Sequence, residues 1–324
     1  MSGNVIEAKN IVVKFYIRRG LRRIGFAAVD NVSIAVPKGS IFGLIGESGS
    51  GKTTLGKVTL ALIKPTKGEV LFQGRNIFDM DKKEFKKYRV NAQYIPQDPY
   101  ASINPYKRVR DILTDIAKYH KLALNNKEAL DMAIDIMNKV GLNPPERYLD
   151  KYPFQLSGGE RQRVSIARAL MLKPAYIVAD EPVTMLDASL KASIVKTIKD
   201  MVREIGSSLL FITHEITLLQ FFGPSTLVAV MYLGKLVEQA TLKELLEEPL
   251  HPYTQALISA IPVPDPKARE TRKLILSGTT PSPLNKPQGC PLSNRCPFAM
   301  DICRKEEPQL KQVSPTHFVA CHLR

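Results

Sequence analysis

The segment Gly46-Glu-Ser-Gly-Ser-Gly-Lys52-Thr53 decides the fold class of this 324-residue chain. It fits the pattern G-x-x-x-x-G-K-[ST] without a mismatch and directly follows Ile41–Ile45, an apolar run that predicts a buried strand. Glycines let the backbone curl so that its N–H groups face phosphate oxygens, and a helix expected from near Lys52 adds the positive end of its dipole. The motif could instead be a glycine-rich turn that binds no ligand, but the predicted strand directly before it makes this alternative less favoured. We therefore predict a phosphate-binding loop.

The types of side chain in this loop suit a nucleotide with Mg²⁺. Lys52 would reach the β and γ phosphates, and the hydroxyl of Thr53 would bind Mg²⁺. The residues predicted to contact the nucleotide are Gly46, Ser48, Gly49, Ser50, Gly51, Lys52, Thr53 and Thr54.

Apolar runs and helical patterns alternate along the rest of the body. Ala175–Ala179 and Ser208–Thr213 are expected to be further buried strands. Leu130, Ile134 and Met137 would share one face of a helix that stops before Gly141, and residues 105–152 lack strand patterns. Strands that alternate with helices indicate an α/β fold around a mainly parallel sheet, with a helical insertion.

Two adjacent carboxylates, Asp180 and Glu181, end the strand that contains Ile177-Val-Ala. Neighbouring residues of a strand point to opposite sides, so the two side chains would have different roles. Asp180 suits the Mg²⁺ shell, and Glu181 suits a base that polarises the attacking water. An acidic pair at a strand end is common, but its place after a phosphate loop strengthens this interpretation.

The segment Leu156-Ser-Gly-Gly-Glu160, followed by Arg161-Gln-Arg163, is expected to open a helix. Ser157 is a good N-cap, and Glu160 completes a capping box, so the segment could be only a well-capped helix. Ser157, Gly158 and Gly159 also leave exposed N–H groups at a helix N-terminus, which suits a second anion.

These motifs together resemble those of the ABC ATPases. Leu156–Gln162 is similar to the family's signature motif, and Gln97 in Tyr94-Ile-Pro-Gln-Asp matches the Q-loop. Asp187 matches the D-loop, although Thr-Met-Leu-Asp stands where Ser-Ala-Leu-Asp is usual. His214 matches the switch histidine, with Glu215 where Asp is usual.

The resemblance implies a P-loop NTPase core with a helical subdomain at about residues 98–157. The ATP bound by one subunit would be closed over by Ser157, Gly158, Gly159 and Glu160 of a second. Gln97 would bind Mg²⁺, sense the γ-phosphate and signal to a membrane partner. His214 would hold the γ-phosphate and the water, and Phe15 or Tyr16 would stack on adenine.

The C-terminal part resembles the ATP-binding subunits of oligopeptide/dipeptide importers. The segments that carry this resemblance are Gln97–Pro105, Val230–Glu238, Pro249–Thr254 and Ala260–Pro266. It implies an ATPase domain over 1–240, a C-terminal region over 241–324, and import of peptides or of oligosaccharides. The implied partners are two transmembrane permease subunits, an external substrate-binding protein and a second ATPase. Tyr100 favours the subunit type that pairs with a different ATPase, which makes a heterodimer.

All four cysteines, Cys290, Cys296, Cys303 and Cys321, lie in this proline-rich C-terminal region. For a chain expected inside the cell, a metal is a better interpretation than disulfides, although no C-x-x-C pair is present. Four thiolates suit a [4Fe–4S] cluster, and the family resemblance implies the same. Zinc, with His317 or His322 as a further ligand, and four reduced thiols remain as alternatives.

The net charge of +15, from 46 Lys and Arg against 31 Asp and Glu, leaves a second function class open. A soluble ABC ATPase that acts on nucleic acid or ribosomes would be basic, but such proteins usually have two cassettes or a coiled-coil insertion, so we expect no nucleic-acid partner. An ATP-binding regulator without turnover is disfavoured by Glu181 and His214. No run reaches the ~20 apolar residues of a membrane span, and no secretory signal is expected. We therefore predict a peripheral protein on the cytoplasmic face of the membrane, where anionic lipid could attract its basic residues.

Overall fold

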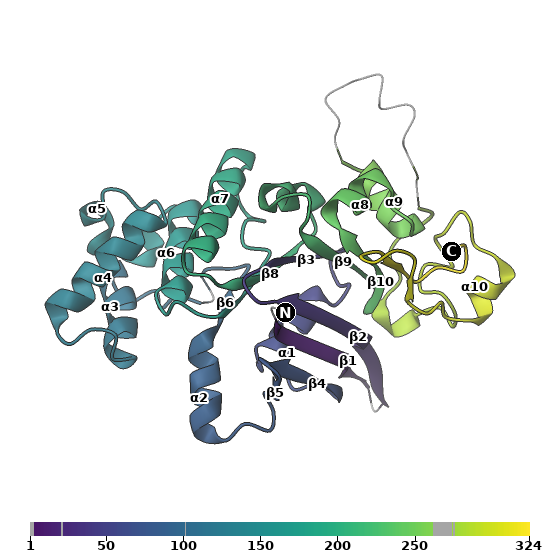
Figure 1. Cartoon of the computed structure of the whole chain (residues 1–324), viewed down its shortest axis with the longest axis horizontal. Helices are drawn as coiled ribbons and strands as arrows, with labels where there is room; N and C mark the ends of the chain where they lie inside the picture. The colour runs from purple at the N-terminus through teal and green to yellow at the C-terminus, as the bar shows by residue number, and fades with distance from the viewer. Residues whose placement is uncertain (1–2, 21, 101, 262–273, 275) are drawn as a thin grey trace. The chain divides into compact units, whose positions relative to one another are not determined.

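The computed structural model describes residues 3–20, 22–100, 102–261, 274 and 276–324, so residues 262–266 of the Ala260–Pro266 segment lie outside the described part. The chain divides into two compact units (Figure 1). The helical unit comprises Met1–Val5, Val36–Ser40 and Asp79–Phe211. The second unit, called the loop unit because it contains the phosphate loop, comprises Ile6–Ala35, Ile41–Phe78 and Ile212–Arg324.

The loop unit contains two groups of strands. One sheet has the order β2-β1-β4-β5, and the other strands run in the order β11-β12-β10-β9-β3. Strands β3 and β9 pair in parallel, whereas β9, β10, β12 and β11 pair antiparallel. The strands are β1 (Asn4–Arg19), β2 (Arg22–Pro37), β3 (Ile41–Ile45), β4 (Lys67–Phe72), β5 (Arg75–Asn76), β9 (Leu227–Tyr232), β10 (Lys235–Thr241), β11 (Lys311–Gln312) and β12 (Phe318–Val319).

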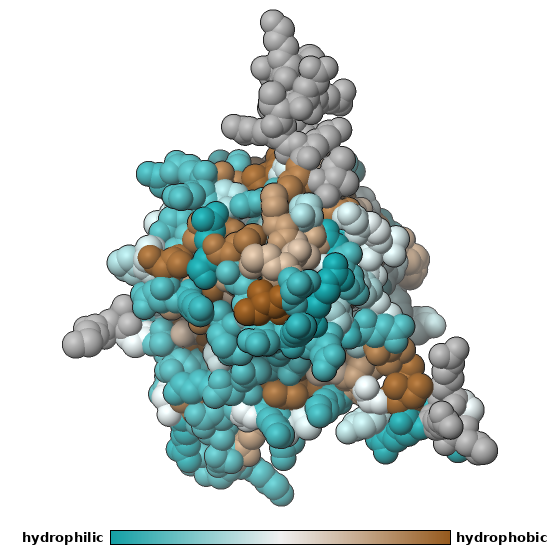
Figure 2. All heavy atoms as spheres, turned by 90° about the vertical axis from the view of Figure 1, so that its right-hand side faces the viewer, coloured by the Kyte–Doolittle hydropathy of each residue, from teal (hydrophilic) through white to brown (hydrophobic). Residues whose placement is uncertain are grey.

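The helices of the loop unit follow its strands. Helix α1 starts directly after the phosphate loop that leaves β3, and its Leu55 and Val58 are fully buried. The helices are α1 (Lys52–Thr59), α8 (Leu242–Glu247), α9 (Pro252–Ser259) and α10 (Asp301–Lys305), with 3₁₀ turns η2 (Ile216–Phe222) and η4 (Pro283–Asn285). Hydrophilic residues cover most of the molecular face shown in Figure 2.

The helical unit has strands in the order β8-β7-β6, with β6 and β7 parallel. Helix α6 packs against β6, and α3, α4 and α6 pack against one another. The elements are α2 (Lys82–Asn91), β6 (Ala92–Ile95), α3 (Val109–Tyr119), α4 (Asn126–Lys139), α5 (Glu146–Leu149), η1 (Pro153–Gln155), α6 (Gly158–Leu170), β7 (Tyr176–Asp180), α7 (Ala188–Glu204) and β8 (Ser208–Thr213).

The predicted α/β class is confirmed, as are the strands before the phosphate loop and at Ser208–Thr213. Leu130, Ile134 and Met137 share a face of α4 as predicted, and Met137 is fully buried, but this face is only part of what the helix buries. Leu130 and Ile134 are half-buried, while Ala129 and Ala133 are fully buried because α3 and α6 both pack on this helix and small residues allow close approach. In the described ranges no helix is long and apolar enough to cross a membrane.

Candidate nucleotide-binding site

The phosphate loop has a backbone that only glycine accommodates at its two ends. Gly46 has φ 151°, and a Cβ there would lie 2.2 Å from the carbonyl oxygen of Met231 at the end of β9. Gly51 has φ 101°, and its Cβ would lie 2.3 Å from the carbonyl oxygen of Ala28. Gly51 is also the N-cap of α1 and provides no side-chain cap, so backbone N–H groups at this helix start are available to an anion.

Lys52 lies inside the loop. Its side chain is buried, and its Nζ donates hydrogen bonds to the carbonyl oxygens of Gly46 at 2.7 Å and Glu47 at 2.8 Å. Ser48 and Gly49 at the tip of the loop are exposed. The loop therefore encloses a positive charge under an accessible tip, which suits the phosphates of a nucleotide.

The acidic pair and Gln97 form a second cluster, in the helical unit. The buried Asp180 ends β7 and accepts a 2.7 Å hydrogen bond from the hydroxyl of Tyr94 on β6. Burial and the neighbouring Asp180 raise the pKa of Tyr94, so this hydroxyl stays protonated and donates. Because β6 and β7 are parallel neighbours, the residues after them also meet, and Nε2 of Gln97 lies 3.3 Å from Oε2 of Glu181.

Glu181 lies one residue beyond β7, in left-handed backbone with φ 45°. Its carboxylate also accepts a 3.0 Å hydrogen bond from the hydroxyl of Thr184. The sequence had suggested that strand alternation orients Glu181. Because Glu181 lies beyond the strand, the turn that follows β7 orients it instead. Tyr94 and Thr184 were missed, because only the pairing of β6 with β7 and this turn bring them to the carboxylates.

The signature helix α6 has the predicted capping box. The hydroxyl of Ser157 accepts the N–H of Glu160 at 3.3 Å, and the carboxylate of Glu160 accepts the N–H of Ser157 at 2.8 Å. Burial alone would raise the pKa of Glu160, but the hydrogen bonds with Ser157, the charge of Lys151 and a hydrogen bond with Tyr148 together lower the pKa. Ser157 and Gly158 are exposed, whereas Gly159 is buried against Leu190.

The buried Arg161 fixes the segment before α6. Its guanidinium donates to the carbonyl oxygens of Pro153 at 2.8 Å and Leu156 at 2.9 Å. It also lies 3.5 Å from the ring centre of Tyr100. These contacts hold the start of the signature helix with Ser157 and Gly158 toward solvent.

Of the remaining predicted residues, Ser50 is buried, and Thr53 and Thr54 in the first turn of α1 are half-buried. The others lie at exposed positions of their own units. Asp187 is the N-cap of α7, and hydrogen bonds from the N–H of Leu190 and the hydroxyl of Ser189 lower its pKa. His214 follows β8, with its Nε2 3.8 Å from Oε1 of Glu215. The aromatic candidates for adenine lie on β1: Phe15 contacts Phe26, and the guanidinium of Arg23 lies 4.3 Å from the ring centre of Tyr16.

Comparisons with known proteins agree with these motifs. The ABC transporter family model matches residues 29–184, and the model of the oligopeptide/dipeptide transporter C-terminal region matches residues 237–303. The oligopeptide transport ATP-binding protein AppF of Bacillus subtilis (strain 168) is 41% identical over 324 residues, which cover 98% of this chain and 97% of AppF. YkfD of the same strain is 43% identical over 312 residues, which cover 96% of this chain and 93% of YkfD.

The chain belongs to the ATP-binding proteins of oligopeptide/dipeptide ABC transporters. Solved structures agree with this family. A dimeric ATP-binding cassette in a post-hydrolysis state, bound to ADP and phosphate, matches with a TM-score of 0.64 and 28% identity, over 73% of this chain and 98% of that one. The dimeric structure of a bacterial ABC transporter cassette matches with a TM-score of 0.63 and 28% identity over the same shares.

The C-terminal region of this ABC transporter protein brings its cysteines together. All four line one small cavity, which His251 and His322 also line. The N–H of Cys290 donates to the carbonyl oxygen of Cys303 at 2.8 Å, and none of the four cysteines forms a disulfide. Burial raises the pKa of the Cys290 thiol to about 11 and also raises the pKa values of Cys296 and Cys321.

The chemistry of these four donors fits an iron–sulfur cluster or zinc, but their arrangement does not yet form a ligand shell. Among the described residues no group of three or more His, Cys, Asp or Glu side chains is arranged to hold a metal ion. His317, a candidate zinc ligand from the sequence, instead lies 2.7 Å from the carboxylate of the buried Glu238.

Proposed function

We propose that this chain is the ATP-hydrolysing subunit that powers peptide import through a membrane ABC transporter. The observation that carries the proposal is the phosphate loop with Lys52 buried inside it, in a chain that matches an oligopeptide transport ATP-binding protein along 98% of its length. Peptide is the favoured substrate class because both the matched C-terminal model and the relatives are named for oligopeptides. Oligosaccharide is the alternative.

The roles of the site residues follow from their chemistry. The loop N–H groups and Lys52 would bind the phosphates, and Thr53, Asp180 and Gln97 offer the oxygen ligands that Mg²⁺ prefers. Glu181 would accept a hydrogen bond from the water that attacks the γ-phosphate, and His214 would orient that water. The reaction takes ATP and water to ADP and phosphate.

We further propose that two ATPase subunits act together, each closing its signature segment over the nucleotide of the other. The exposed Ser157 and Gly158 at the start of α6 support this, since their polar groups face solvent and can meet a partner. A paralogue is the proposed partner. In the assembled transporter the two ATPase subunits would bind two permease subunits on the cytoplasmic face of the membrane.

Within this chain, we propose an ATPase domain over residues 1–240 and a C-terminal region over residues 241–324. Phe15 or Tyr16 would stack on the adenine of the bound ATP.

Hydrolysis tests the enzymatic part directly. In the complex isolated with its membrane partners, Glu181→Gln should bind ATP like the wild type but turn over at least ~100-fold more slowly. Glu204→Gln is the matched control, because Glu204 is an exposed carboxylate at the end of α7. Equal hydrolysis by Glu181→Gln and wild type would refute the base assignment. The substrate class is tested by whether peptide or oligosaccharide stimulates hydrolysis.

For the cysteines we propose a [4Fe–4S] cluster that holds the proline-rich region together. The convergence of all four on one cavity supports it. A bound cluster would take the four thiolates as ligands and offset the burial that favours the protonated thiols of Cys290, Cys296 and Cys321. Iron and acid-labile sulfide should appear in anaerobically purified protein and fall in Cys296→Ser. Zinc without iron would favour the zinc alternative, and the absence of both metals would favour reduced thiols.

A further inference from the structure

Glu47, the second residue of the phosphate loop, is held at each of its polar groups. Its N–H donates to the hydroxyl of Tyr253 at 2.7 Å, and its carbonyl oxygen accepts from Nζ of Lys52 at 2.8 Å. Its carboxylate forms an ion pair with Nη1 of Arg295 at 3.2 Å and accepts the hydroxyl of Thr280. The peptide group before Glu47 is therefore held at its N–H, the peptide group after it is held at its carbonyl oxygen, and the side chain of Glu47 is held as well.

Apart from the bond from Lys52, these contacts come from the C-terminal region, far away in the sequence. Tyr253 lies 206 residues beyond Glu47 and is fully buried in α9, where its ring packs 4.6 Å from that of Tyr232. The side chain of Arg295 is 11% exposed, and its guanidinium also donates to the hydroxyls of Tyr232 and Thr280. The groups that hold Glu47 are thus themselves fixed by packing and hydrogen bonds.

The loop needs such support because its backbone is permissive. Gly46, Gly49 and Gly51 all have positive φ, so the unbound loop has many accessible conformations, and binding must select one of them. Because Glu47 is held in place, the unbound loop has fewer accessible conformations before the nucleotide binds. The same contacts also position the carbonyl group of Glu47, which Lys52 contacts. Preorganisation of this kind raises affinity.

We propose that Tyr253 and Arg295 are positioning residues for the ATPase reaction, which act through Glu47 to keep the phosphate loop in its nucleotide-binding conformation. This inference rests on the proposed function of the loop. It assigns the C-terminal region a role in nucleotide binding beyond the role of its cysteines.

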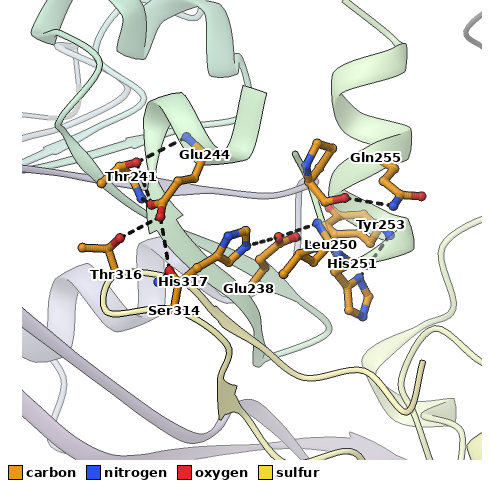
Figure 3. Close-up of polar contacts among 11 residues, drawn as sticks. Glu238, Thr241, Glu244, Leu250, His251, Tyr253, Gln255, Ser314, Thr316 and His317 are labelled. Carbon is orange, nitrogen blue, oxygen red and sulfur yellow. Dashed lines mark hydrogen bonds and ion pairs between the residues drawn. The ribbon is translucent and has the colours of Figure 1, made fainter. Parts of the chain in front are cut away.

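The C-terminal region has other attachments besides these contacts. Figure 3 shows a further group of hydrogen bonds, in which the carboxylate of Glu238 contacts His317 and the carboxylate of Glu244 accepts the hydroxyls of Ser314 and Thr316. This group anchors the last strands to β10 and α8 and lies on residues that do not contact Glu47. Loss of the bonds to Glu47 should therefore change nucleotide binding without releasing the region.

The test measures dissociation constants for Mg-ADP and for a non-hydrolysable ATP analogue on the full-length chain by calorimetry. Tyr253→Phe removes one hydroxyl and keeps the ring, and Arg295→Gln removes the ion pair. Each should weaken binding about five- to tenfold, since the half-buried N–H or carboxylate of Glu47 loses a partner. Arg295→Lys should restore most of the affinity. Thr316→Val is the matched control, because it removes a hydroxyl of the same region that bonds to Glu244 instead.

A double-variant cycle separates positioning from general loss of stability. If Arg295 acts through Glu47, the variant carrying both Glu47→Gln and Arg295→Gln should bind no more weakly than the weaker single variant. Additive losses, or wild-type affinity in both Tyr253→Phe and Arg295→Gln, would overturn the inference. Glu47 is only half-buried, so Glu47→Gln gives a readout even if Tyr253→Phe does not fold. Lys52→Ala should abolish nucleotide binding. If Lys52→Ala binds nucleotide with wild-type affinity, the proposed function itself is refuted.

Discussion

Substitutions at Ser157 separate two roles of this residue, the N-cap of a helix and a ligand of the nucleotide held by a partner subunit. The capping box has two hydrogen bonds, and only one of them uses the hydroxyl. That bond is 3.3 Å long, while the 2.8 Å bond from the N–H of Ser157 to Glu160 survives in Ser157→Ala. We therefore expect Ser157→Ala to lower the free energy of unfolding by about 1 kcal/mol.

Ser157→Asp keeps an acceptor at the N-cap and adds a negative charge where the helix dipole favours one. Its free energy of unfolding should stay within about 1 kcal/mol of the wild-type value. A carboxylate in place of a donating hydroxyl repels a phosphate, so hydrolysis by the assembled transporter should fall at least ~100-fold. Stability and activity would thus change in different variants.

The assays are urea unfolding of the full-length chain followed by circular dichroism, and phosphate release by the complex isolated from membranes. Glu204→Gln is the control, because Glu204 is an exposed carboxylate at the end of α7 and lies outside the signature segment. Wild-type hydrolysis by Ser157→Asp would show that Ser157 only caps the helix. A loss above ~3 kcal/mol in Ser157→Ala would show that the cap does not account for its contribution to stability.

Three further predictions concern other parts of the site. Glu181→Gln in a dimer of cassettes should prolong the ATP-bound state, seen as ATP that stays bound through gel filtration, whereas rapid release as ADP would contradict its role. Gly51→Ala should lower the free energy of unfolding, measured in urea, by about 2–4 kcal/mol, because its Cβ would meet a backbone carbonyl oxygen. Gly49→Ala has open space around it and should lower the same free energy by about 1 kcal/mol. Equal losses in the two variants would contradict this reasoning. His317→Ala leaves the fully buried Glu238 without its side-chain hydrogen-bond partner and should cost about 3 kcal/mol by the same assay. A loss below ~1 kcal/mol would show that the backbone N–H groups on Glu238 suffice.

The parts of the fold that follow from local chemistry could be predicted from the sequence. The pattern around Lys52 predicted the loop between a buried strand and a helix, and Ser157 with Glu160 predicted the capping box, because each depends on neighbouring residues only. The predicted face of α4 was incomplete, because two helices pack on this helix and also bury Ala129 and Ala133, which the spacing of its larger apolar residues does not include.

Contacts between distant segments could not be predicted in this way. The bond from Tyr94 to Asp180 requires the pairing of β6 with β7, and the bond from Glu47 to Tyr253 joins residues 206 positions apart. The spacing of the cysteines likewise gave no indication that all four line one cavity; the family resemblance suggested it.

The central claim is that this chain hydrolyses ATP to drive peptide import as part of a membrane complex. The most direct measurement is capture of the tagged chain from native membranes, identification of the co-purifying proteins by mass, and assay of ATP hydrolysis by the captured complex with and without peptide. We predict two multi-span proteins, a second ATPase and hydrolysis that peptide stimulates and Glu181→Gln abolishes. Capture of ribosomes or nucleic acid without any membrane protein, or hydrolysis that persists in Glu181→Gln, would contradict the claim.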